Sequence, residues 1–541
     1  MNRVLEECDR AGADFAADPV HDLRVALRRC RSIADGMIAM DPDPAWKAMK
    51  KAGKELFRKL GELRDTHVMM DWVNQLNPTH TAEALNSYQQ IANAETSPVQ
   101  QELAQTTEGS DPVAKALLEI LASREDEQKR AAREALDDFD RKQWRQWTKI
   151  LPRRAARVRP GSVLFKHLAL ERWTEARELH RRALRSRSQA AMHSLRIGIK
   201  RFRYIVENFL PKQHAAWSGD LKKLQDILGE VHDLDVLWAT ALFSHVFRSL
   251  EDRRRWHSRI LAERTERIEL YREKMTGPNS LWPVWRAALP QGRQLQAIAT
   301  RRMKLWAKGL DPDFAHSQRV AAFAMQLLDG LTAAGMMPTT NGIDTRSTLF
   351  AAGLLHDVGK AKKNGGHHKK SFKLIQSHAT PLGWRAEDLR RAAIVARYHR
   401  GALPARRHKA LHDLPAAERK VTVQLAAILR LANALDASHD GRIRQVRVER
   451  DTDSSVNRNG LAGKLSAQAS ANGHLGKAKQ SAITIAAEGY SAFSPNAQAV
   501  AAERHLLETV LRRPVIVKPM KSVPKLQRGR PSVKLAARRR G

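Results

Sequence analysis

The sequence has little cysteine and lacks any long apolar run. Only Cys8 and Cys30 occur among its 541 residues, which excludes a disulfide-stapled scaffold and a cysteine-rich zinc module and fits a reducing compartment. No stretch of about 18 apolar residues occurs, so no membrane-spanning helix is expected. The charged N-terminus also lacks the apolar segment of a secretory signal. We therefore expect a cytoplasmic protein with no membrane span.

Acidic residues are scarce relative to basic ones. The chain has 94 Lys and Arg against 58 Asp and Glu, a formal net charge of +36 and a calculated pI of about 10.7. Hydrophobic residues make up 42% of the chain, which is enough to exclude a wholly disordered protein. The excess charge predicts a polyanionic partner, which could be nucleic acid, an anionic membrane surface or a phosphate polymer.

Apolar residues recur every three to four positions through the first 300 residues, which predicts helices almost throughout. Prolines predict helix breaks near residues 41–44, 77–78, 111–112, 151–152, 159–161 and 210–211. The region 301–440 is also helical in character but rich in histidine. Strand patterns first occur at 443–448 and 482–485, and a helix near 495–511 with a short strand at 514–517 completes a small α+β cap.

These patterns predict a mainly α fold of several parts. The expected spans are 1–290 for a duplicated helical bundle, 301–440 for a second helical domain, 441–519 for the cap and 520–541 for a disordered basic tail.

An internal repeat organises the first 290 residues. The segment Val20–Ser32 is similar to Met192–Tyr204, and the later segment Leu60–Val68 is similar to Leu228–Val236. Because both pairs occur in the same order, the repeat indicates duplication rather than shared composition.

Each copy of the first segment places four cationic residues along one side of a helix, at i, i+3, i+7 and i+10. These cationic stripes are His21, Arg24, Arg28 and Arg31 in the first copy and His193, Arg196, Lys200 and Arg203 in the second. Like charges in a row destabilise a helix unless counter-charge is present. One alternative is a solvated face paired with Glu62, Asp65, Glu230 and Asp233 from neighbouring helices.

The stripes suit repeated phosphates better than bases. They contain no Asn or Gln, the residues that commonly read base edges, whereas Arg and Lys bind phosphate directly. A groove or tunnel between the two copies would present both stripes to one linear polyanion.

The doubled H-x-x-R-V/I-x-x-R/K-R-x-R motif, each copy followed by L-G-x-x-x-D, resembles the CHAD family of helical domains. The resemblance implies an internally duplicated bundle whose basic central pore binds inorganic polyphosphate. It assigns this role to the eight stripe residues, with Lys54 and Lys222 as further candidates. The second motif differs between copies, since Arg64 aligns with His232 and His67 with Asp235, so these positions are left out.

The histidine-rich region contains an adjacent His356-Asp357 pair after an apolar turn, with His316 upstream and Asn433 and Asp436 downstream. Imidazole and carboxylate ligands suit a divalent cation such as Mn, Mg or Fe, which would activate water for attack on a phosphoryl group. The predicted metal ligands are His316, His356, Asp357 and either Asn433 or Asp436, and His356 and Asp357 are the predicted catalytic residues.

This spacing resembles the HD-domain metal phosphohydrolases. Residues 305–519 resemble more closely the C-terminal region of the exopolyphosphatase/guanosine pentaphosphatase family, through the segments LLHDVGK, ARYHR and LAAILRLANALD. Two departures stand out: the actin-like catalytic half of that family has no counterpart here, and Asn433 occupies the place of the terminal metal-binding Asp. A catalytically silent His356–Asp357 pair is therefore one alternative, and metal-free phosphate binding by Arg397, His399 and Arg400 is another.

Together these observations predict a polyphosphate-binding protein, associated with polyphosphate granules in the cytoplasm, whose HD-type region either binds the polymer further or hydrolyses it. Whether the chain is an enzyme stays open at this point. The alternatives are a phosphohydrolase acting on a nucleotide or triphosphate, and a nucleic-acid-associated basic protein.

Overall fold

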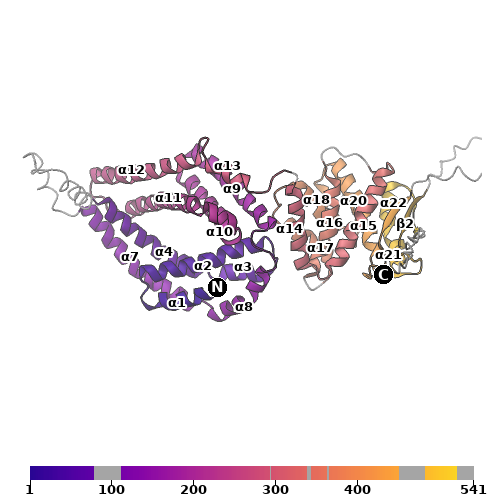
Figure 1. Cartoon of the computed structure of the whole chain (residues 1–541), viewed down its shortest axis with the longest axis horizontal. Helices are drawn as coiled ribbons and strands as arrows, with labels where there is room; N and C mark the ends of the chain where they lie inside the picture. The colour runs from indigo at the N-terminus through magenta and orange to yellow at the C-terminus, as the bar shows by residue number, and fades with distance from the viewer. Residues whose placement is uncertain (78–110, 293, 338–342, 362–364, 450–481, 521–541) are drawn as a thin grey trace, which may run out of the picture. The chain divides into compact units, whose positions relative to one another are not determined.

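The computed structural model describes residues 1–77, 111–292, 294–337, 343–361, 365–449 and 482–520. These residues form two compact units (Figure 1). Unit 1 comprises residues 1–309 with 381–383, and unit 2 comprises residues 310–380 with the described residues from 384 onward. None of the described helices is long and apolar enough to cross a membrane.

Unit 1 is built from helices alone among the residues that are described. These are α1 (Asn2–Asp14), α2 (Ala17–Ile38), α3 (Pro44–Ala52), α4 (Lys54–Leu76), α7 (Pro112–Asp137), α8 (Arg141–Ala155), α9 (Val163–Ser186), α10 (Gln189–Phe209), α11 (Pro211–Phe243), α12 (Leu250–Met275), α13 (Leu281–Ala287) and α14 (Gln294–Leu310).

Three of the predicted proline breaks coincide with the start of a helix. Pro44, Pro112 and Pro211 each occupy the first turn of a helix, where a missing backbone N–H costs nothing. The break predicted at Pro152 is wrong, because α8 continues through this residue to Ala155. Burial of Leu151 beside Pro152 holds this last turn against the core.

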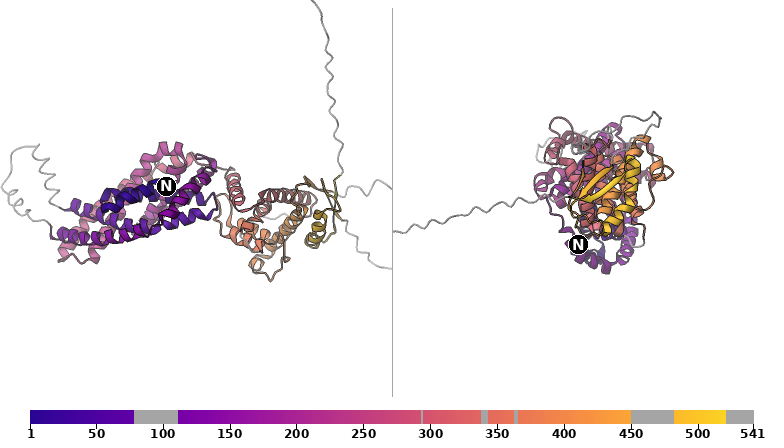
Figure 2. Two further views of the ribbon diagram at one scale, coloured as in Figure 1. Left: turned by 90° about the horizontal axis from the view of Figure 1, so that it is seen from below. Right: turned by 90° about the vertical axis from the view of Figure 1, so that its right-hand side faces the viewer.

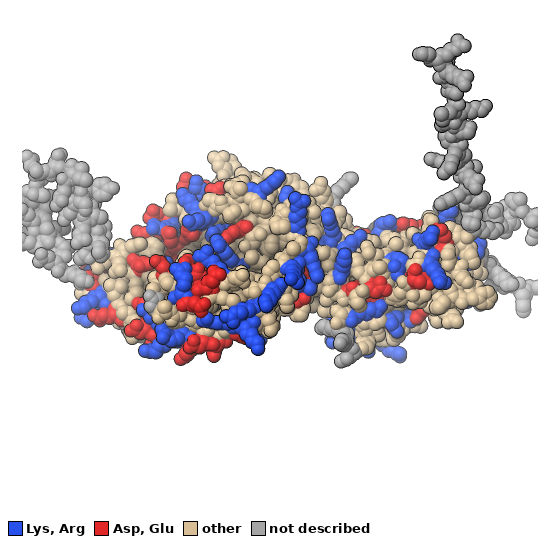
Figure 3. Space-filling model, turned by 60° about the horizontal axis from the view of Figure 1, so that its bottom comes forward, with Lys and Arg blue, Asp and Glu red and all other residues tan. Residues whose placement is uncertain are grey.

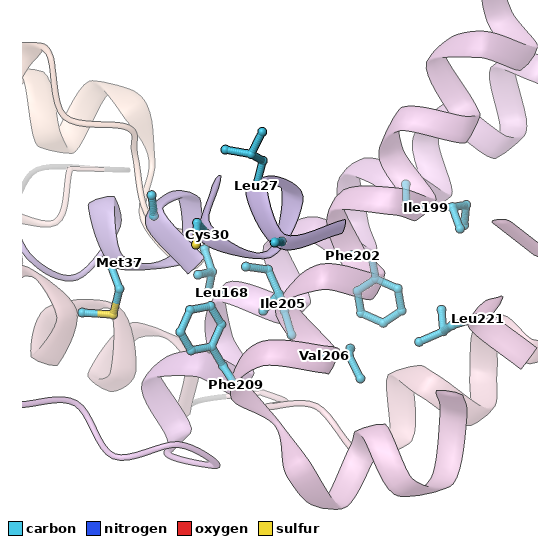
Figure 4. Packing of buried hydrophobic residues seen from close by; sticks show 14 of the residues in the cluster. Leu27, Cys30, Met37, Leu168, Ile199, Phe202, Ile205, Val206, Phe209 and Leu221 are labelled. Atoms are coloured by element: carbon cyan, nitrogen blue, oxygen red, sulfur yellow. The ribbon is translucent and has the colours of Figure 1, made fainter. Parts of the chain in front are cut away.

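The core of unit 1 lies behind the two cationic stripes. Figure 4 shows Cys30 of α2 facing Ile205 and Phe209 of α10. The apolar residues opposite the stripes are at most 4% exposed in both copies: Val20, Leu23, Leu27, Cys30, Met192, Leu195, Ile199 and Phe202.

The two helices that carry the stripes approach closely. A Cβ atom at Gly36 of α2 would lie 2.2 Å from the ring of Phe209 in α10, so only glycine permits this contact. The Asn208 side chain also donates a hydrogen bond to Ser32 Oγ at 2.9 Å. The duplication therefore brings its two stripe helices together.

Unit 2 combines helices with one small sheet. Its elements are α15 (Phe314–Ala333), α16 (Thr345–Leu355), the 3₁₀ turn η1 (Val358–Ala361), α17 (His367–Gln376), α18 (Ala386–Arg397), α19 (Lys409–His412), α20 (Ala416–Leu435), β1 (Val446–Glu449), β2 (Ile483–Ala487), α21 (Pro495–Glu503), α22 (His505–Leu511) and β3 (Val515–Pro519).

The sheet has the order β1-β2-β3 (Figure 2). Strand β1 pairs antiparallel to β2, with Val446 opposite Ala487, and β3 pairs parallel to β2, with Val515 opposite Ile483. The sheet packs on α15, where a Cβ at Gly330 would meet the Val448 side chain at 2.6 Å.

The mainly α fold with a small α+β cap is thus confirmed. The single helix predicted near 495–511 is two helices, α21 and α22, and the strands lie one to three residues later than predicted. From residue 521 onward, the predicted basic tail lies outside the residues that the structure describes.

Candidate functional site

The cationic stripes of α2 and α10 lie within electrostatic reach of one another. Arg24 and Arg28 of α2 are close enough to Arg196 and Lys200 of α10 for their charges to act on each other. We call the eight stripe residues together the cationic cluster. Figure 3 shows basic side chains gathered on one face of unit 1, with acidic side chains beside them.

Crowding within the cluster is clearest at Lys200. Burial, together with the charges of Arg196, Arg28, Arg24 and Arg31, lowers the pKa of Lys200 to about 8. Burial also lowers the pKa of Arg24 and Arg31. Burial is thus the main cause of all three shifts, and at Lys200 the neighbouring cations add to it.

Two arginines at equivalent places in the repeat keep a buried nitrogen without a partner. Among the described residues, Arg24 Nη1 and Arg196 Nε make no hydrogen bond although both atoms are buried, and the same holds for the Tyr204 hydroxyl. An unpaired buried donor costs about 1–3 kcal/mol, and more when it is charged. An anion that accepts hydrogen bonds from these donors would recover that cost.

Acidic residues do not neutralise the centre of the cluster. Of the partners proposed for a solvated face, Glu62 pairs with Arg58 and Lys59, and Glu230 pairs with Arg267. Among the described residues, Arg24, Arg28, Arg196 and Lys200 form no ion pair within 4.0 Å. At the edge of the cluster, Arg203 lies 3.7 Å from Glu207.

Asp65 of α4 and Asp233 of α11 are equivalent residues of the second repeated motif, and both face the cluster. Burial raises the pKa of both carboxyl groups, to about 6 for Asp233, while nearby Arg196 acts in the opposite direction. The charge of Asp65 also raises the pKa of Asp233, so the two acids lie near one another.

Two aromatic rings, those of Phe57 and Tyr204, contact cations of the cluster. The sequence motifs assign neither ring a role. The guanidinium carbons of Arg31 and Arg24 lie 4.5 Å and 5.2 Å from the ring centre of Phe57. The charged ends of Arg28 and Lys200 each lie 5.9 Å from the ring centre of Tyr204. Such cation–π contacts hold charged side chains in place without neutralising them.

The two stripe histidines lie at the edge of the cluster. His21 is exposed, and burial with the charges of Arg64 and Arg28 lowers its pKa. His193 is also exposed, with Nδ1 3.4 Å from Nδ1 of His232, and burial lowers the pKa of His232 to about 4. A cavity of about 760 Å³ borders His193 and His232.

The remaining predicted residues are less central. Lys222 is exposed. Burial raises the pKa of Asp226, and the charges of Arg203, Lys222 and Arg28 act in the opposite direction. Lys54 is exposed at the first residue of α4, where its described charge partner is Glu55. Arg64 occupies a position where the two copies of the repeat differ. Its charge acts to lower the pKa values of His21, Arg24 and Asp65.

Unit 2 contains a second group of convergent side chains. Five helices and the segments that follow them supply it: His316 from α15, His356 and Asp357 after α16, His367 at the start of α17, His399 after α18 and Asn433 from α20.

Close helix packing brings these residues together. A Cβ at Gly353 of α16 would lie 2.8 Å from the Ala321 backbone of α15. A Cβ at Gly359 would lie 2.3 Å from the backbone oxygen of His367, so glycine at this position lets α17 reach the His356-Asp357 turn. Ser371 Oγ then links the two by donating to the His356 carbonyl at 2.6 Å.

The predicted metal ligands converge on one oxygen of Asp357. Asp357 Oδ2 lies 3.3 Å from His356 Nε2 and 3.8 Å from His316 Nε2. Asn433 Oδ1 lies 3.1 Å from the same nitrogen of His316. His316, His356 and Asp357 form one of the groups of donor atoms that could hold a metal ion.

Asp436 lies on the other side of His316. Its Oδ2 atom accepts a hydrogen bond from His316 Nδ1 at 2.7 Å and pairs with Arg319 at 2.8 Å. Of the two predicted candidates, Asn433 therefore lies on the side of the donor atoms, and Asp436 orients the imidazole from behind.

Two atoms of this group are buried without a hydrogen-bond partner among the described residues: His356 Nε2 and Asp357 Oδ1. His356 Nδ1–H donates to the Gly353 carbonyl at 2.7 Å, which leaves the Nε2 lone pair facing Asp357. Burial opposes the charge of Asp357, but the neighbouring imidazoles outweigh it and keep the pKa of Asp357 far below its usual range. The donor set and its unpaired atoms fit a divalent cation.

Basic side chains surround this group. Lys360 Nζ lies 2.5 Å from Asp357 Oδ2. Burial and the nearby charges of Arg397 and Arg400 lower the pKa of His368 to about 4. The buried Arg430 donates to the carbonyls of Tyr398 and Gly401 and pairs with Glu503, which fixes the segment that carries His399 and Arg400.

Comparison with known families agrees with both resemblances. The CHAD domain model matches residues 2–242, and the model of the Ppx/GppA phosphatase, domain III, matches residues 300–468. No curated protein matches the chain. The chain thus carries a CHAD domain followed by a Ppx/GppA domain III, as predicted, and both domains fit a function related to polyphosphate.

Proposed function

We propose that the chain binds inorganic polyphosphate through the cationic cluster of unit 1. The observation that carries this proposal is the pair of equivalent arginines, Arg24 and Arg196, each with a buried nitrogen that no described residue satisfies. A polyanion with closely spaced phosphates can accept from both donors at once.

The electrostatics of the cluster support the same ligand. Bound phosphates would offset the burial and the cationic repulsion that together lower the pKa of Lys200 to about 8. Side chains that typically read base edges, Asn and Gln, are absent from both stripes. Phosphate recognition therefore accounts for the stripes better than sequence-specific nucleic-acid binding does.

The test is a binding titration with long-chain polyphosphate at fixed ionic strength. We expect Arg24→Gln combined with Arg196→Gln to weaken binding by about 100-fold or more, since each charged hydrogen bond contributes about 1.5–3 kcal/mol. Arg182→Gln combined with Arg185→Gln is the matched control, because these exposed residues of α9 change the net charge equally.

Two further arms separate the alternatives. Removing residues 520–541 should leave polyphosphate binding nearly unchanged, and a loss as large as that of the double arginine variant would contradict the proposal. DNA should compete poorly at equal phosphate concentration. Strong competition would favour a nucleic-acid-associated protein instead.

For unit 2 we propose metal-dependent hydrolysis of phosphoanhydrides. The supporting observation is the convergence of His316, His356, Asp357 and Asn433, with the His356 nitrogen and an Asp357 oxygen left without partners. These residues would hold a divalent cation, which when bound supplies an activated water for phosphoryl attack. Lys360, Arg397 and Arg400 carry the positive charge that would hold an anionic phosphate at the site.

The test is phosphate release from polyphosphate with Mn²⁺ or Mg²⁺, compared with EDTA. We expect metal-dependent release that Asp357→Ala abolishes while polyphosphate binding persists. Release that survives this substitution would refute the site, whereas release from nucleoside triphosphates alone would identify a small-substrate phosphohydrolase. An absence of release with binding retained would make unit 2 a binding or regulatory domain.

A further inference from the structure

The cationic stripe of α10 begins beside a cavity of unit 1. The cavity has a volume of about 760 Å³, and residues of α10 and α11 form most of its lining, with Arg124 of α7 beside them. Helices α10 and α11 pack against each other (Figure 1). The volume falls within the range of small-molecule sites, which is about 300–1,000 Å³.

The cavity adjoins the cationic cluster. His193, the first stripe residue of α10, lines the cavity together with His232 of α11, and their Nδ1 atoms are 3.4 Å apart. Burial lowers the pKa of His232, and the charges of Arg196 and Lys200 act on it in the same direction. A ligand in the cavity can therefore extend phosphates along the stripe toward Arg196, whose buried Nε atom has no partner among the described residues.

One wall of the cavity is apolar. Val236, Ala239 and Phe243 follow one another at i, i+3 and i+7 along α11, so they lie on one side of this helix. Phe243 ends the row, and its side chain is 82% exposed. Phosphate gains nothing from such a wall, whereas the flat face of a nucleobase stacks on an aromatic ring.

The polar part of the lining carries groups that can bind the edge of a base. Gln189 Nε2 donates to Asp235 Oδ1 at 3.0 Å, and Arg264 Nε pairs with the same oxygen at 2.7 Å. These two contacts orient the carboxylate. Because both use Oδ1, the Oδ2 atom of Asp235 can accept a hydrogen bond from the exocyclic amino group of a base.

The repeat itself does not require these features. In the alignment of the two copies, Phe243 corresponds to Gln75 and Gln189 corresponds to Ala17. A linear polyphosphate needs only the cationic stripe, which both copies supply. The lining that only the second copy has suits a ligand that carries an aromatic, hydrogen-bonding part beside its phosphates.

We infer that unit 1 also binds nucleoside polyphosphates, with the base in this cavity against Phe243 and the phosphates along the stripe from His193 toward Arg196. This inference rests on the phosphate binding proposed for the cationic cluster and names a second class of ligand for it. Linear polyphosphate and a nucleoside polyphosphate then compete for the stripe of α10.

The test is a calorimetric titration of the full-length protein with ATP, GTP and tripolyphosphate, in EDTA so that no divalent cation is bound to unit 2. At least one nucleotide should bind about tenfold or more tightly than tripolyphosphate, since stacking of a single base contributes roughly this factor. Phe243→Ala should remove the advantage and leave the affinities for tripolyphosphate and long-chain polyphosphate unchanged. Phe243→Tyr keeps a ring and should retain the advantage.

Two further measurements locate the site. Photolabelling with 8-azido-ATP should modify a peptide of α10 or α11, and excess polyphosphate should prevent the labelling. Phe493→Ala, a change at a phenylalanine of unit 2 that is 98% exposed, is the matched control and should alter no affinity. Circular dichroism and thermal unfolding show whether each variant is folded.

Nucleotides that bind no more tightly than tripolyphosphate, or an advantage that survives Phe243→Ala, would overturn the inference and leave polyphosphate binding in place. Labelling confined to unit 2 would overturn it as well. Failure of the proposed function gives a different result, because tripolyphosphate and long-chain polyphosphate then also fail to bind.

Discussion

The Asp436 carboxylate accepts a hydrogen bond from His316 Nδ1 at 2.7 Å and leaves His316 Nε2 facing Asn433 and Asp357. Arg319 pairs with the same carboxylate at 2.8 Å and holds it in this orientation. Asp436 is therefore a positioning residue for the imidazole, whereas Asn433 is on the side where a cation would bind.

Replacing Asp436 should weaken metal binding without abolishing it. Asp436→Asn retains the volume but loses the charge that orients His316, so we expect a 10–100-fold loss in affinity at the His316 position. A Mn²⁺ titration of chelator-treated full-length protein, with free Mn²⁺ followed by its EPR signal, measures this effect. Asp440→Asn, at an exposed acid nearby, is the control. A loss as complete as that of His316→Gln would mean that Asp436 is itself a ligand.

The low pKa of Lys200 predicts that polyphosphate affinity falls as the pH rises. Below pH 8 the ammonium is charged in the free protein, but above pH 8 it is increasingly neutral and must bind a proton before it can pair with phosphate. We expect up to a tenfold loss of affinity per pH unit above 8, measured by titration between pH 7 and 9.5. Lys200→Arg keeps the charge and should flatten this limb of the profile, and an unchanged limb would assign it to another group.

Asp233 predicts a second pH dependence in the same cluster. Its pKa of about 6 makes the carboxylate negative at pH 8, where it repels a polyanion, and mostly neutral at pH 5. Asp233→Asn should therefore raise polyphosphate affinity several-fold at pH 8 and hardly at all at pH 5. Asp220→Asn, at an exposed residue of the same helix, controls for net charge. A gain of equal size at both pH values would contradict this assignment.

Gly359 should be intolerant of any side chain. Alanine would place Cβ 2.3 Å from the His367 oxygen and 2.6 Å from the Ser371 nitrogen, both backbone atoms that cannot rotate away. We expect Gly359→Ala to destabilise unit 2 by about 1–3 kcal/mol.

The matched control for that change is Gly229→Ala in α11, where nothing lies within 4 Å of the new Cβ. Removing a glycine from a helix interior should stabilise unit 1 by about 0.5–1 kcal/mol. Thermal unfolding followed by circular dichroism checks both. Equal destabilisation by the two substitutions would refute the packing argument at Gly359.

Much of the cationic cluster could be predicted from the sequence because duplication repeats it. The stripes and their apolar backs follow from helical spacing, and prolines mark the starts of α3, α7 and α11. The aromatic supports could not be found this way, since Phe57 aligns with Gln225 and Tyr204 with Ser32. An alignment of the two copies points only to residues that both copies share, so it does not point to an aromatic residue present in one copy alone.

The site in unit 2 was predictable in residue type but not in geometry. Asn433 and Asp436 are three residues apart, but α20 ends at Leu435, so helical spacing does not fix the direction of Asp436. The sequence offers His399 as a phosphate ligand together with Arg397 and Arg400 of the ARYHR segment. The contact of His399 with His367 depends on the close approach of α17 at Gly359, which no local pattern reveals.

Arg430 has a practical consequence for how unit 2 can be divided. Its buried guanidinium donates to the backbone around His399 and finds its counter-charge in Glu503 of α21. A fragment ending near residue 440, where the sequence suggests a domain boundary, would lack Glu503. It would leave the buried guanidinium without its counter-charge, which lowers the free energy of unfolding by about 3–5 kcal/mol. The small cap thus braces the loop that carries His399 and Arg400, and a fragment of unit 2 must include α21 to keep this ion pair.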